Sequence, residues 1–223
     1  GVQSLDDEVL TASFRGHDSK CVYDAASLIK RKGFRLGIQT MTGLPEDTRE
    51  KCIETAKKVI SMKPDFVRIY PALVIKGTQL EKEFIKGRYI PQKLEEAVDL
   101  CAHLLDLYNE NGIKVIRIGL QITENINEGP ESEVVAGPVH SAFRQLVESR
   151  LARRKIDALL EKMDISYARH LVIRTDKSNL SDVIGQKREN IKYLKDKYGF
   201  YTVKAEADES LLPGAKVIKL FVE

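Results

Sequence analysis

Residues 33–45, GFRLGIQTMTGLP, have the pattern of a buried strand that runs into a polar turn. Gly33 is typical of a helix end, and the apolar and β-branched residues that follow predict a strand over residues 34–40. The turn contains Gly43, which permits close backbone approach, and Pro45, which stiffens the chain. Asp47 then predicts the start of a new helix. The stretch therefore predicts one complete strand–turn–helix unit.

The same unit recurs on both sides of this stretch. Helices are expected over residues 18–32, 47–63 and 94–110, with strands ending at Val2 and covering residues 66–70 and 113–118. Ser4 and Asp7 suggest a capped short helix up to Leu10, and residues 71–91 are expected to form a long loop. Alternating strands and helices imply an α/β fold with a parallel sheet and right-handed crossovers.

The pattern changes after residue 119. Residues 120–138 are expected to form a loop, and residues 139–163 an amphipathic helix. The tail predicts strands over residues 171–174, 201–205 and 216–221, and helices over residues 180–184 and 191–198. The domain boundaries that we predict are 1–138 for the first α/β domain, 139–165 for a linking helix and 166–223 for a small α+β domain.

Composition narrows the class of protein. The chain has 223 residues, 43% of them hydrophobic, and we find neither an apolar run long enough to cross a membrane nor a signal peptide. We therefore expect a cytoplasmic protein without a membrane partner. The net charge is −2 over residues 1–140 and +5 over residues 141–223, which is compatible with a nucleic-acid partner for the tail but also with an ordinary solvated surface.

Polar or loop-forming residues follow each predicted strand of the first domain. In parallel α/β folds functional groups gather beyond the carboxyl ends of the strands. The candidate positions there are Gln3, Ser4, Gln39, Met41, Gly43, Tyr70 and Pro71. Arg15 could hold a carboxylate through two parallel hydrogen bonds. The alternative is that these side chains only cap helices and satisfy loops.

Five motifs in order give this pattern a family resemblance. They are GVQS at residues 1–4, RGH at 15–17, GFRLGIQTMTGLP at 33–45, PDFVRIYPALVIKGT at 64–78 and AGPVHSAFRQLV at 136–147. Together they resemble the radical S-adenosylmethionine (SAM) enzymes, in particular the branch with the catalytic subunit of Elongator and its bacterial relatives. The oxygen-independent coproporphyrinogen oxidases look more distant. The resemblance implies that the first domain is a fragment of a partial TIM-type barrel.

The resemblance also assigns roles to the candidate residues. Gln3 and Gln39 match positions that bind the SAM ribose, although Gln39 replaces a residue that is often acidic in the coproporphyrinogen oxidases. Arg15 matches the arginine that pairs with the SAM carboxylate. Met41 and Pro71 match contacts to adenine, and Ser4 and Gly43 complete the candidate cofactor-binding set. His17 lies beside Arg15 and could face the substrate, although loop hydrogen bonding is the simpler role. His140 is expected either to cap a helix or to pack in the core.

Radical SAM enzymes reduce SAM with a [4Fe-4S] cluster that is held by three cysteines in a C-x-x-x-C-x-x-C loop. Cys21, Cys52 and Cys101 lie far apart and do not form such a loop. The resemblance therefore implies a carboxyl-terminal fragment that cannot bind the cluster and is inactive alone. Half a barrel exposes a sheet edge, so we expect the missing amino-terminal half or self-association to stabilise it.

A second resemblance concerns the tail. Residues 183–192, VIGQKRENIK, resemble the glycine-containing loop of KH domains, in which nucleic-acid backbone approaches the loop closely. The candidate RNA-binding residues are Gly185, Gln186, Lys187, Arg188 and Lys192. Arg188 stands where the family has a second glycine, so a left-handed backbone there would cost roughly 1–2 kcal/mol. A KH-like packing module that binds nothing is the alternative.

Three functions remain open from the sequence. The first is a carboxyl-terminal part of a radical SAM enzyme whose parent acts on tRNA or a small substrate. The second is an α/β protein that binds tRNA or another RNA through the basic tail. The third is a βα scaffold that assembles with a partner.

Overall fold

The computed structural model describes all residues except 122, 124 and 213. The chain divides into two compact units, Gly1–Arg144 and Gln145–Glu223. No helix among the described residues is both long and apolar enough to span a membrane. The elements of the first unit are α1 (Asp7–Ala12), α2 (Ser19–Arg31), β1 (Gly37–Thr42), α3 (Arg49–Ser61), β2 (Phe66–Pro71), β3 (Val74–Ile75), α4 (Gln79–Ile85), α5 (Leu94–Glu110), β4 (Lys114–Ile118) and β5 (Val134–Ala136).

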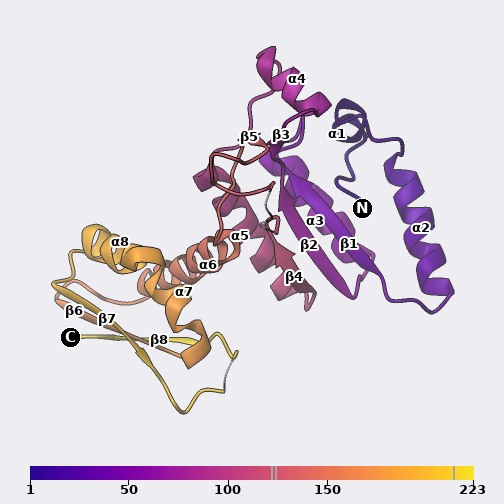
Figure 1. The fold of residues 1–223 in the computed structure, drawn as a ribbon. Coiled ribbons are helices and arrows are strands. Elements are labelled where there is room, and N and C mark those ends of the chain that lie inside the picture. The colour runs from indigo at the N-terminus through magenta and orange to yellow at the C-terminus, as the bar shows by residue number, and fades with distance from the viewer. Residues whose placement is uncertain (122, 124, 213) are drawn as a thin grey trace. The chain divides into compact units, whose positions relative to one another are not determined.

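A parallel three-stranded sheet in the order β1-β2-β4 forms the centre of the first unit (Figure 1). Its strands alternate between buried and accessible residues, as in Gly37–Thr42, where every second side chain is buried. Thr40 and Thr42 of the buried set lie next to Tyr108 and Cys101 of α5. Helices α3 and α5 therefore cover one face of the sheet. The side chains that alternate with the buried ones along each strand lie on the other, accessible face. The expected α/β fold with a parallel sheet is confirmed.

The caps of the helices explain where several of them begin. Asp18 accepts a hydrogen bond from Cys21 N before α2, and Thr48 accepts one from Lys51 N before α3. At the amino end, the expected strand at Val2 is reduced to a single bridge between Gln3 and Thr40. The cap of α1 is Asp6 rather than the expected Ser4, because the carboxylate of Asp6 accepts from Val9 N.

The two long loops expected from the sequence contain regular structure. Residues 71–91 include β3 and the helix α4, and residues 120–138 include β5, which pairs antiparallel with β3. Thr78 caps α4 by accepting from Glu81 N, at 3.2 Å, and Glu81 accepts from Gly77 N. This reciprocal cap was visible in the sequence as Thr-x-x-Glu. The loop interpretation was therefore wrong at these elements.

The second unit places helices on a mixed sheet. Its elements are the helix α6 (Phe143–Leu160), which begins at the end of the first unit, then β6 (His170–Thr175), a 3-10 turn (Lys177–Asn179), α7 (Leu180–Ile184), a 3-10 turn (Gln186–Arg188), α8 (Glu189–Tyr198), β7 (Thr202–Ala207) and β8 (Ile218–Val222). The strand order is β7-β6-β8, with β6 parallel to β7 and antiparallel to β8. Leu160, Leu171 and Leu194 are among the fully buried side chains of its core.

The expected strands and helices of this unit are present with small shifts at their ends. The helix α7 has the expected bounds, whereas α6 begins at Phe143 instead of residue 139. His140 Nδ1 accepts from Ala142 N at 3.0 Å, just before α6, in agreement with its expected capping role.

Candidate functional site

Two glutamine side chains meet at the accessible face of the sheet. Gln3 N donates to Gln39 O at 2.9 Å, and Met41 N donates to Gln3 O at 2.8 Å. These bonds place the chain around Gln3 beside β1. The two side chains are close, since Gln39 Nε2 lies 3.5 Å from Gln3 Oε1. Gln3 has a left-handed backbone with φ of 66°, which costs about 1–2 kcal/mol for a residue with a Cβ. The packing around it therefore holds this carboxamide in place.

Arg15 completes the group, and one of its donors, the buried Nε, lacks an acceptor among the described residues. Its Nη2 donates to Met41 Sδ at 3.7 Å. Its Nε is buried and has no hydrogen-bond partner among the described residues. An unpaired buried donor costs about 1–3 kcal/mol, so the guanidinium fits an anionic group that would accept from it. His17 Nε2 lies 3.4 Å from Val2 O, which agrees with the simpler loop role.

Ser4, Gly43 and Pro71 do not join this group. Ser4 is buried, its hydroxyl 3.4 Å from that of Thr55, and it accepts from Asp6 N. Gly43, with φ of 72°, accepts from the Tyr89 hydroxyl at 2.6 Å. A Cβ on Gly43 would lie 2.7 Å from the Gln92 side chain, so this turn needs glycine for packing.

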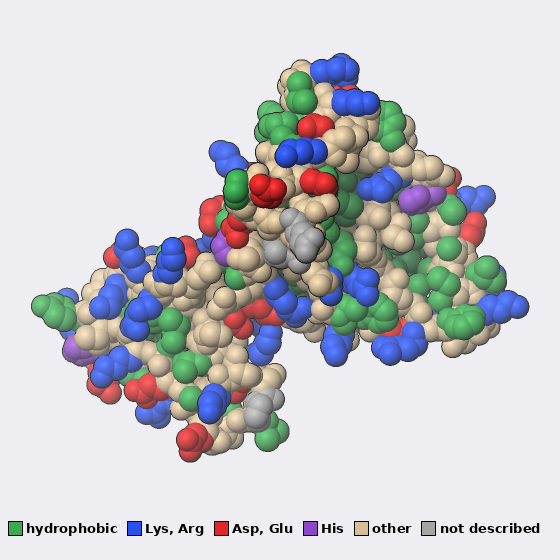
Figure 2. Space-filling model, in the orientation of Figure 1, with side chains coloured by type: hydrophobic (Ala, Val, Ile, Leu, Met, Phe, Trp, Pro, Cys, Tyr) green, Lys and Arg blue, Asp and Glu red, His purple; other side chains and the backbone are tan. Residues whose placement is uncertain are grey.

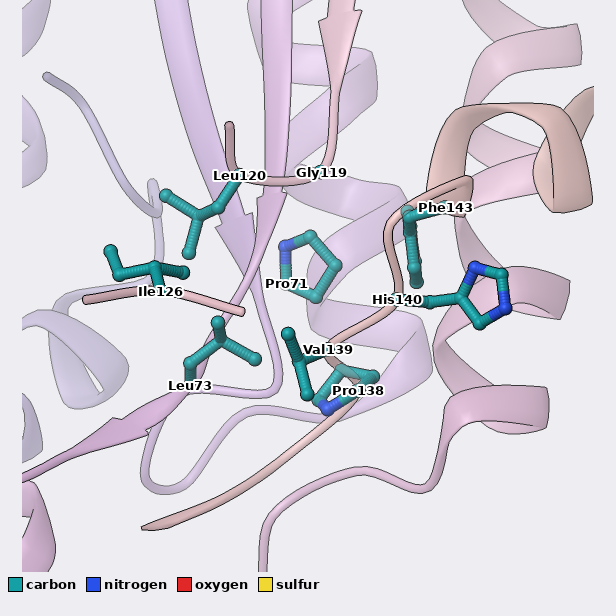
Figure 3. A pocket seen from close by; sticks show the side chains of 9 residues that line it. All are labelled: Pro71, Leu73, Gly119, Leu120, Ile126, Pro138, Val139, His140 and Phe143. Atoms are coloured by element: carbon teal, nitrogen blue, oxygen red, sulfur yellow. The ribbon is translucent and has the colours of Figure 1, made fainter. Parts of the chain in front are cut away.

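Pro71 lies on the opposite face of the sheet from Met41. It pairs in register with Thr42, which is buried under α5, whereas Met41 pairs with Tyr70. Figure 3 shows Pro71 facing Phe143 in a narrow cavity whose volume is about 10 Å³. Such a space holds at most about one water molecule. The other lining residues are Leu73, Gly119, Leu120, Ile126, Pro138, Val139 and His140.

A larger cleft of about 460 Å³ lies beside the group of Gln3, Gln39, Met41 and Arg15. Of these four residues, Arg15 is the one that lines the cleft. The sequence did not point to this cleft, because α4 was not expected. Its apolar wall includes Phe14, Leu44 and Tyr89, and its polar wall includes Glu83 and Arg15. The volume is within the range of small-molecule sites.

Asp47 is a buried carboxyl group near these residues, and its pKa is raised. Burial raises its pKa, although hydrogen bonds from Cys52 Sγ at 3.0 Å and Gly43 N at 3.1 Å act in the opposite direction. One of its oxygens, Oδ1, is buried and has no partner among the described residues. Burial, with the Asp47 charge nearby, also raises the pKa of Tyr89 to about 12.

The cysteines do not fit an iron–sulfur cluster. Burial raises the pKa of Cys52, and it raises the pKa of Cys101 to about 12, whereas a cluster needs thiolates. Cys21 lies exposed on α2. Across the described part of the chain, no three His, Cys, Asp or Glu side chains come together as a metal site.

The basic loop of the second unit has an unusual backbone. Lys187 and Arg188 both have left-handed φ values, 50° and 63°, and both side chains are exposed. Gly185 has φ of 77°, and a Cβ there would lie 3.0 Å from Asn190 N. The Asn190 amide anchors the loop by donating to the carbonyls of Ser149, Asp182 and Val183. Figure 2 shows Lys and Arg side chains gathered over α8, next to this loop.

Known proteins with related sequences agree with the motifs. Residues 64–153 match the family described as the radical SAM C-terminal domain. The tRNA uridine(34) acetyltransferase of Methanocaldococcus jannaschii is 34% identical over 46% of this chain and 20% of its own length. Human Elongator complex protein 3 is 31% identical over 68% of this chain and 27% of its own length.

A solved structure of the Methanocaldococcus infernus Elp3 with an N-terminal deletion matches with a TM-score of 0.59 and 26% identity. The match covers 70% of this chain and 35% of that one. The chain thus spans about a fifth to a third of the length of these relatives. It contains a radical SAM carboxyl-terminal domain, the class of protein that the motifs predicted. More particularly, it is a relative of the Elongator-like branch of that class.

Proposed function

We propose that residues 1–144 supply the SAM-binding edge of an Elongator-like radical SAM enzyme. The observation that carries this proposal is the group of Gln3, Gln39, Met41 and Arg15, with its unpaired buried Arg15 Nε. In this assignment the two carboxamides bind the ribose hydroxyls and Arg15 binds the carboxylate of the methionine moiety. Met41 lies against the adenine, while Ser4, Gly43 and Pro71 act by shaping the strand ends.

SAM, when reduced by a [4Fe-4S] cluster, supplies the 5′-deoxyadenosyl radical of this family. The cysteines of this chain do not fit the cluster, since two are buried with raised pKa values. We therefore propose that the chain is not catalytically competent alone. Its own residues bind and orient the cofactor, and the cluster is held by another part of the enzyme or by a partner.

The substrate that we propose is tRNA. Relatives named tRNA uridine(34) acetyltransferase match 46% to 67% of this chain. The proposal transfers that substrate class to this chain because these relatives and the radical SAM C-terminal domain match over residues that the chain shares with them.

Calorimetric titration with SAM tests the cofactor site. Arg15→Gln should weaken SAM binding by about tenfold or more, since a charge-assisted pair is lost. Arg31→Gln, an exposed arginine of α2, is the matched control and should bind as the unchanged chain does. S-adenosylhomocysteine should also bind, because it retains the ribose and the carboxylate. Equal affinities for the Arg15 and Arg31 variants would contradict the assignment of Arg15.

A second function, RNA binding by the KH-like tail, is favoured by the strained basic loop. Left-handed backbone at Lys187 and Arg188 costs free energy, and such strain gathers at ligand sites. Gly185 and Gln186 would allow close approach of the RNA backbone, with Lys187, Arg188 and Lys192 pairing with phosphates.

Filter binding of tRNA over a range of salt concentrations tests this second function. Lys187→Glu with Arg188→Glu should lower the affinity and flatten its salt dependence. The control is Lys162→Glu with Lys204→Glu, two exposed lysines of the same unit outside the loop. If both pairs of substitutions weaken binding equally, the effect is one of net charge, and the loop is not the site.

A further inference from the structure

Two arginines lie side by side on the accessible face of the central sheet because of a β-bulge. Val67 pairs with Val115, but Arg68 pairs with Arg117, so Ile116 is an extra residue in β4. Without the bulge, Ile116 would lie opposite Arg68, and Arg117 would lie opposite Ile69, whose side chain is buried. The bulge therefore turns Arg117 to the face that carries Arg68, and bulges commonly re-aim side chains near functional sites.

The arginines extend the row that begins with the two glutamines. Gln39 pairs in register with Arg68, so an amide and two guanidiniums cross the three strands in one line. Neighbouring strands lie about 4.8 Å apart, which puts the three side chains within reach of a single small group. Both arginines are exposed. Arg117 Nη1 donates to Gln121 Oε1 at 3.1 Å, and no described acidic side chain forms an ion pair with either arginine.

Like charges directly opposite each other across a sheet are destabilising. An anion that accepts from both guanidiniums removes that repulsion, and the planar guanidinium fork suits phosphate oxygens in particular. The row lies two residues before Met41 and Tyr70, which form the next pair on the same face, towards the amino ends of the strands. A phosphate bound there would sit beside the group that we assign to SAM.

We propose that Arg68 and Arg117 form a phosphate site for the nucleotide substrate of this domain, next to Gln39 in the same row. The proposal deepens the proposed function, on which it rests for the identity of the substrate, and it identifies the group bound as phosphate. Arg68 and Arg117 bind the phosphate, while the neighbouring Gln39 amide stays with Gln3 in the group that we assign to SAM. The bulged residue Ile116 acts only by setting the register.

Thermal unfolding in phosphate and in chloride at equal ionic strength tests the site. The full chain carries Lys187→Gly and Arg188→Gly, so that the loop of the second unit does not bind the anion. Phosphate should raise the Tm of this chain by mass action. Arg68→Gln and Arg117→Gln should each abolish that rise and should raise the Tm in chloride, because they remove the repulsion. Arg31→Gln should change neither result.

Direct binding of inorganic phosphate, a nucleoside 5′-monophosphate and a short single-stranded RNA distinguishes the possible sources of the phosphate. A substrate site predicts that the nucleotide or the RNA binds about tenfold more tightly than inorganic phosphate, with the preference lost in Arg68→Gln. Equal binding of all three probes would limit the site to a free anion and would contradict its role for a nucleotide. A phosphate effect that survives both arginine substitutions would overturn the proposal.

The two proposals fail in different ways. SAM affinity should be unchanged in Arg117→Gln, since Arg117 lies on β4, two strands away from Gln39 on β1. If SAM does not bind but phosphate does, the cofactor assignment fails and the phosphate site remains. If SAM binds and phosphate has no specific effect on Tm, the phosphate site fails and the cofactor assignment remains.

Discussion

Single residues near the candidate site carry strain and buried polarity that a purely structural loop would avoid. Gln3 has a left-handed backbone, Arg15 Nε is buried without a described partner, and so is Asp47 Oδ1. Each costs free energy of the order of 1–3 kcal/mol. Of the three, only Asp47 changes charge in the acidic range, so it offers a direct measure of how burial acts here.

Asp47→Asn should remove a pH dependence of stability. Burial raises the folded-state pKa of Asp47 above 3.8, so the folded state holds this proton more tightly than the unfolded state. The protonated Asp47 carboxyl stabilises the fold fully at pH values below its pKa in the unfolded chain. This stabilisation is lost as the pH rises through its pKa in the folded chain. The stability of Asp47→Asn relative to the unchanged chain should therefore increase as the pH rises above about 4. Urea unfolding at several pH values measures this difference.

The control for this prediction is Asp164→Asn, an exposed carboxyl whose pKa is lowered by hydrogen bonds from Ser166. Its relative stability should change with pH in the opposite direction. If the difference between Asp47→Asn and the unchanged chain is the same at every pH, the carboxyl of Asp47 is hydrated in solution.

The residues of the candidate site show how far the sequence could lead. The carboxyl ends of parallel strands meet at one edge, so Gln3, Gln39 and Met41 could be grouped from the motif order alone. Pro71 could have been separated from them, because side chains alternate along a strand and Pro71 pairs with buried Thr42. Arg117 could not have been placed, because the bulge at Ile116 depends on the pairing of β2 with β4.

At the scale of elements, the sequence predicted helices with clear caps and missed those in loops. The bounds of α7 and the end of α8 at Gly199 follow from local signals. The helix α4 was missed although Thr78 and Glu81 mark its start, since Gly and Lys around it suggested a loop. The short strands β3 and β5 pair across 59 to 62 residues of chain, so no local pattern defines them.

The strained loop between α7 and α8 gives a prediction in which stability and binding change in opposite directions. Lys187→Gly with Arg188→Gly relieves two left-handed non-glycine residues and should stabilise the second unit by about 1–2 kcal/mol per residue, less the added entropy of the unfolded chain. The same change removes two exposed cations and should weaken tRNA binding. Urea unfolding and filter binding on the same sample measure both effects.

Gly185→Ala is the control for that loop. Its φ of 77° and the 3.0 Å approach of a Cβ to Asn190 N predict a loss of stability. A loss of stability in the double glycine variant as well would mean that the left-handed backbone is not present in solution. Unchanged tRNA affinity of the double glycine variant would mean that the loop contributes to packing and does not bind RNA.

At the scale of the whole molecule, apolar side chains remain uncovered over α2. Tyr23, Leu28 and Phe34, which we call the α2 patch, are 37%, 49% and 71% exposed. Figure 2 shows green side chains gathered over this helix and the turn that follows it. Only Val22 and Ala26 of α2 are buried. Exposed apolar clusters of this kind mark interaction surfaces in soluble proteins, which supports the proposal that this domain associates with another copy or with a further part of its enzyme.

Leu28→Lys with Phe34→Ser should therefore reduce self-association of the chain. The unchanged chain should sediment as a mixture whose average mass rises with concentration, because burial of the α2 patch gains about 25 cal/mol per Å² of apolar surface. The substituted chain should sediment as a monomer, with the stability of its fold unchanged, since both side chains are largely exposed. Ile90→Ser is the control, because Ile90 is 88% exposed but lies outside α2. A well-folded monomer of the unchanged chain at every concentration would contradict self-association and leave the α2 patch for a different partner.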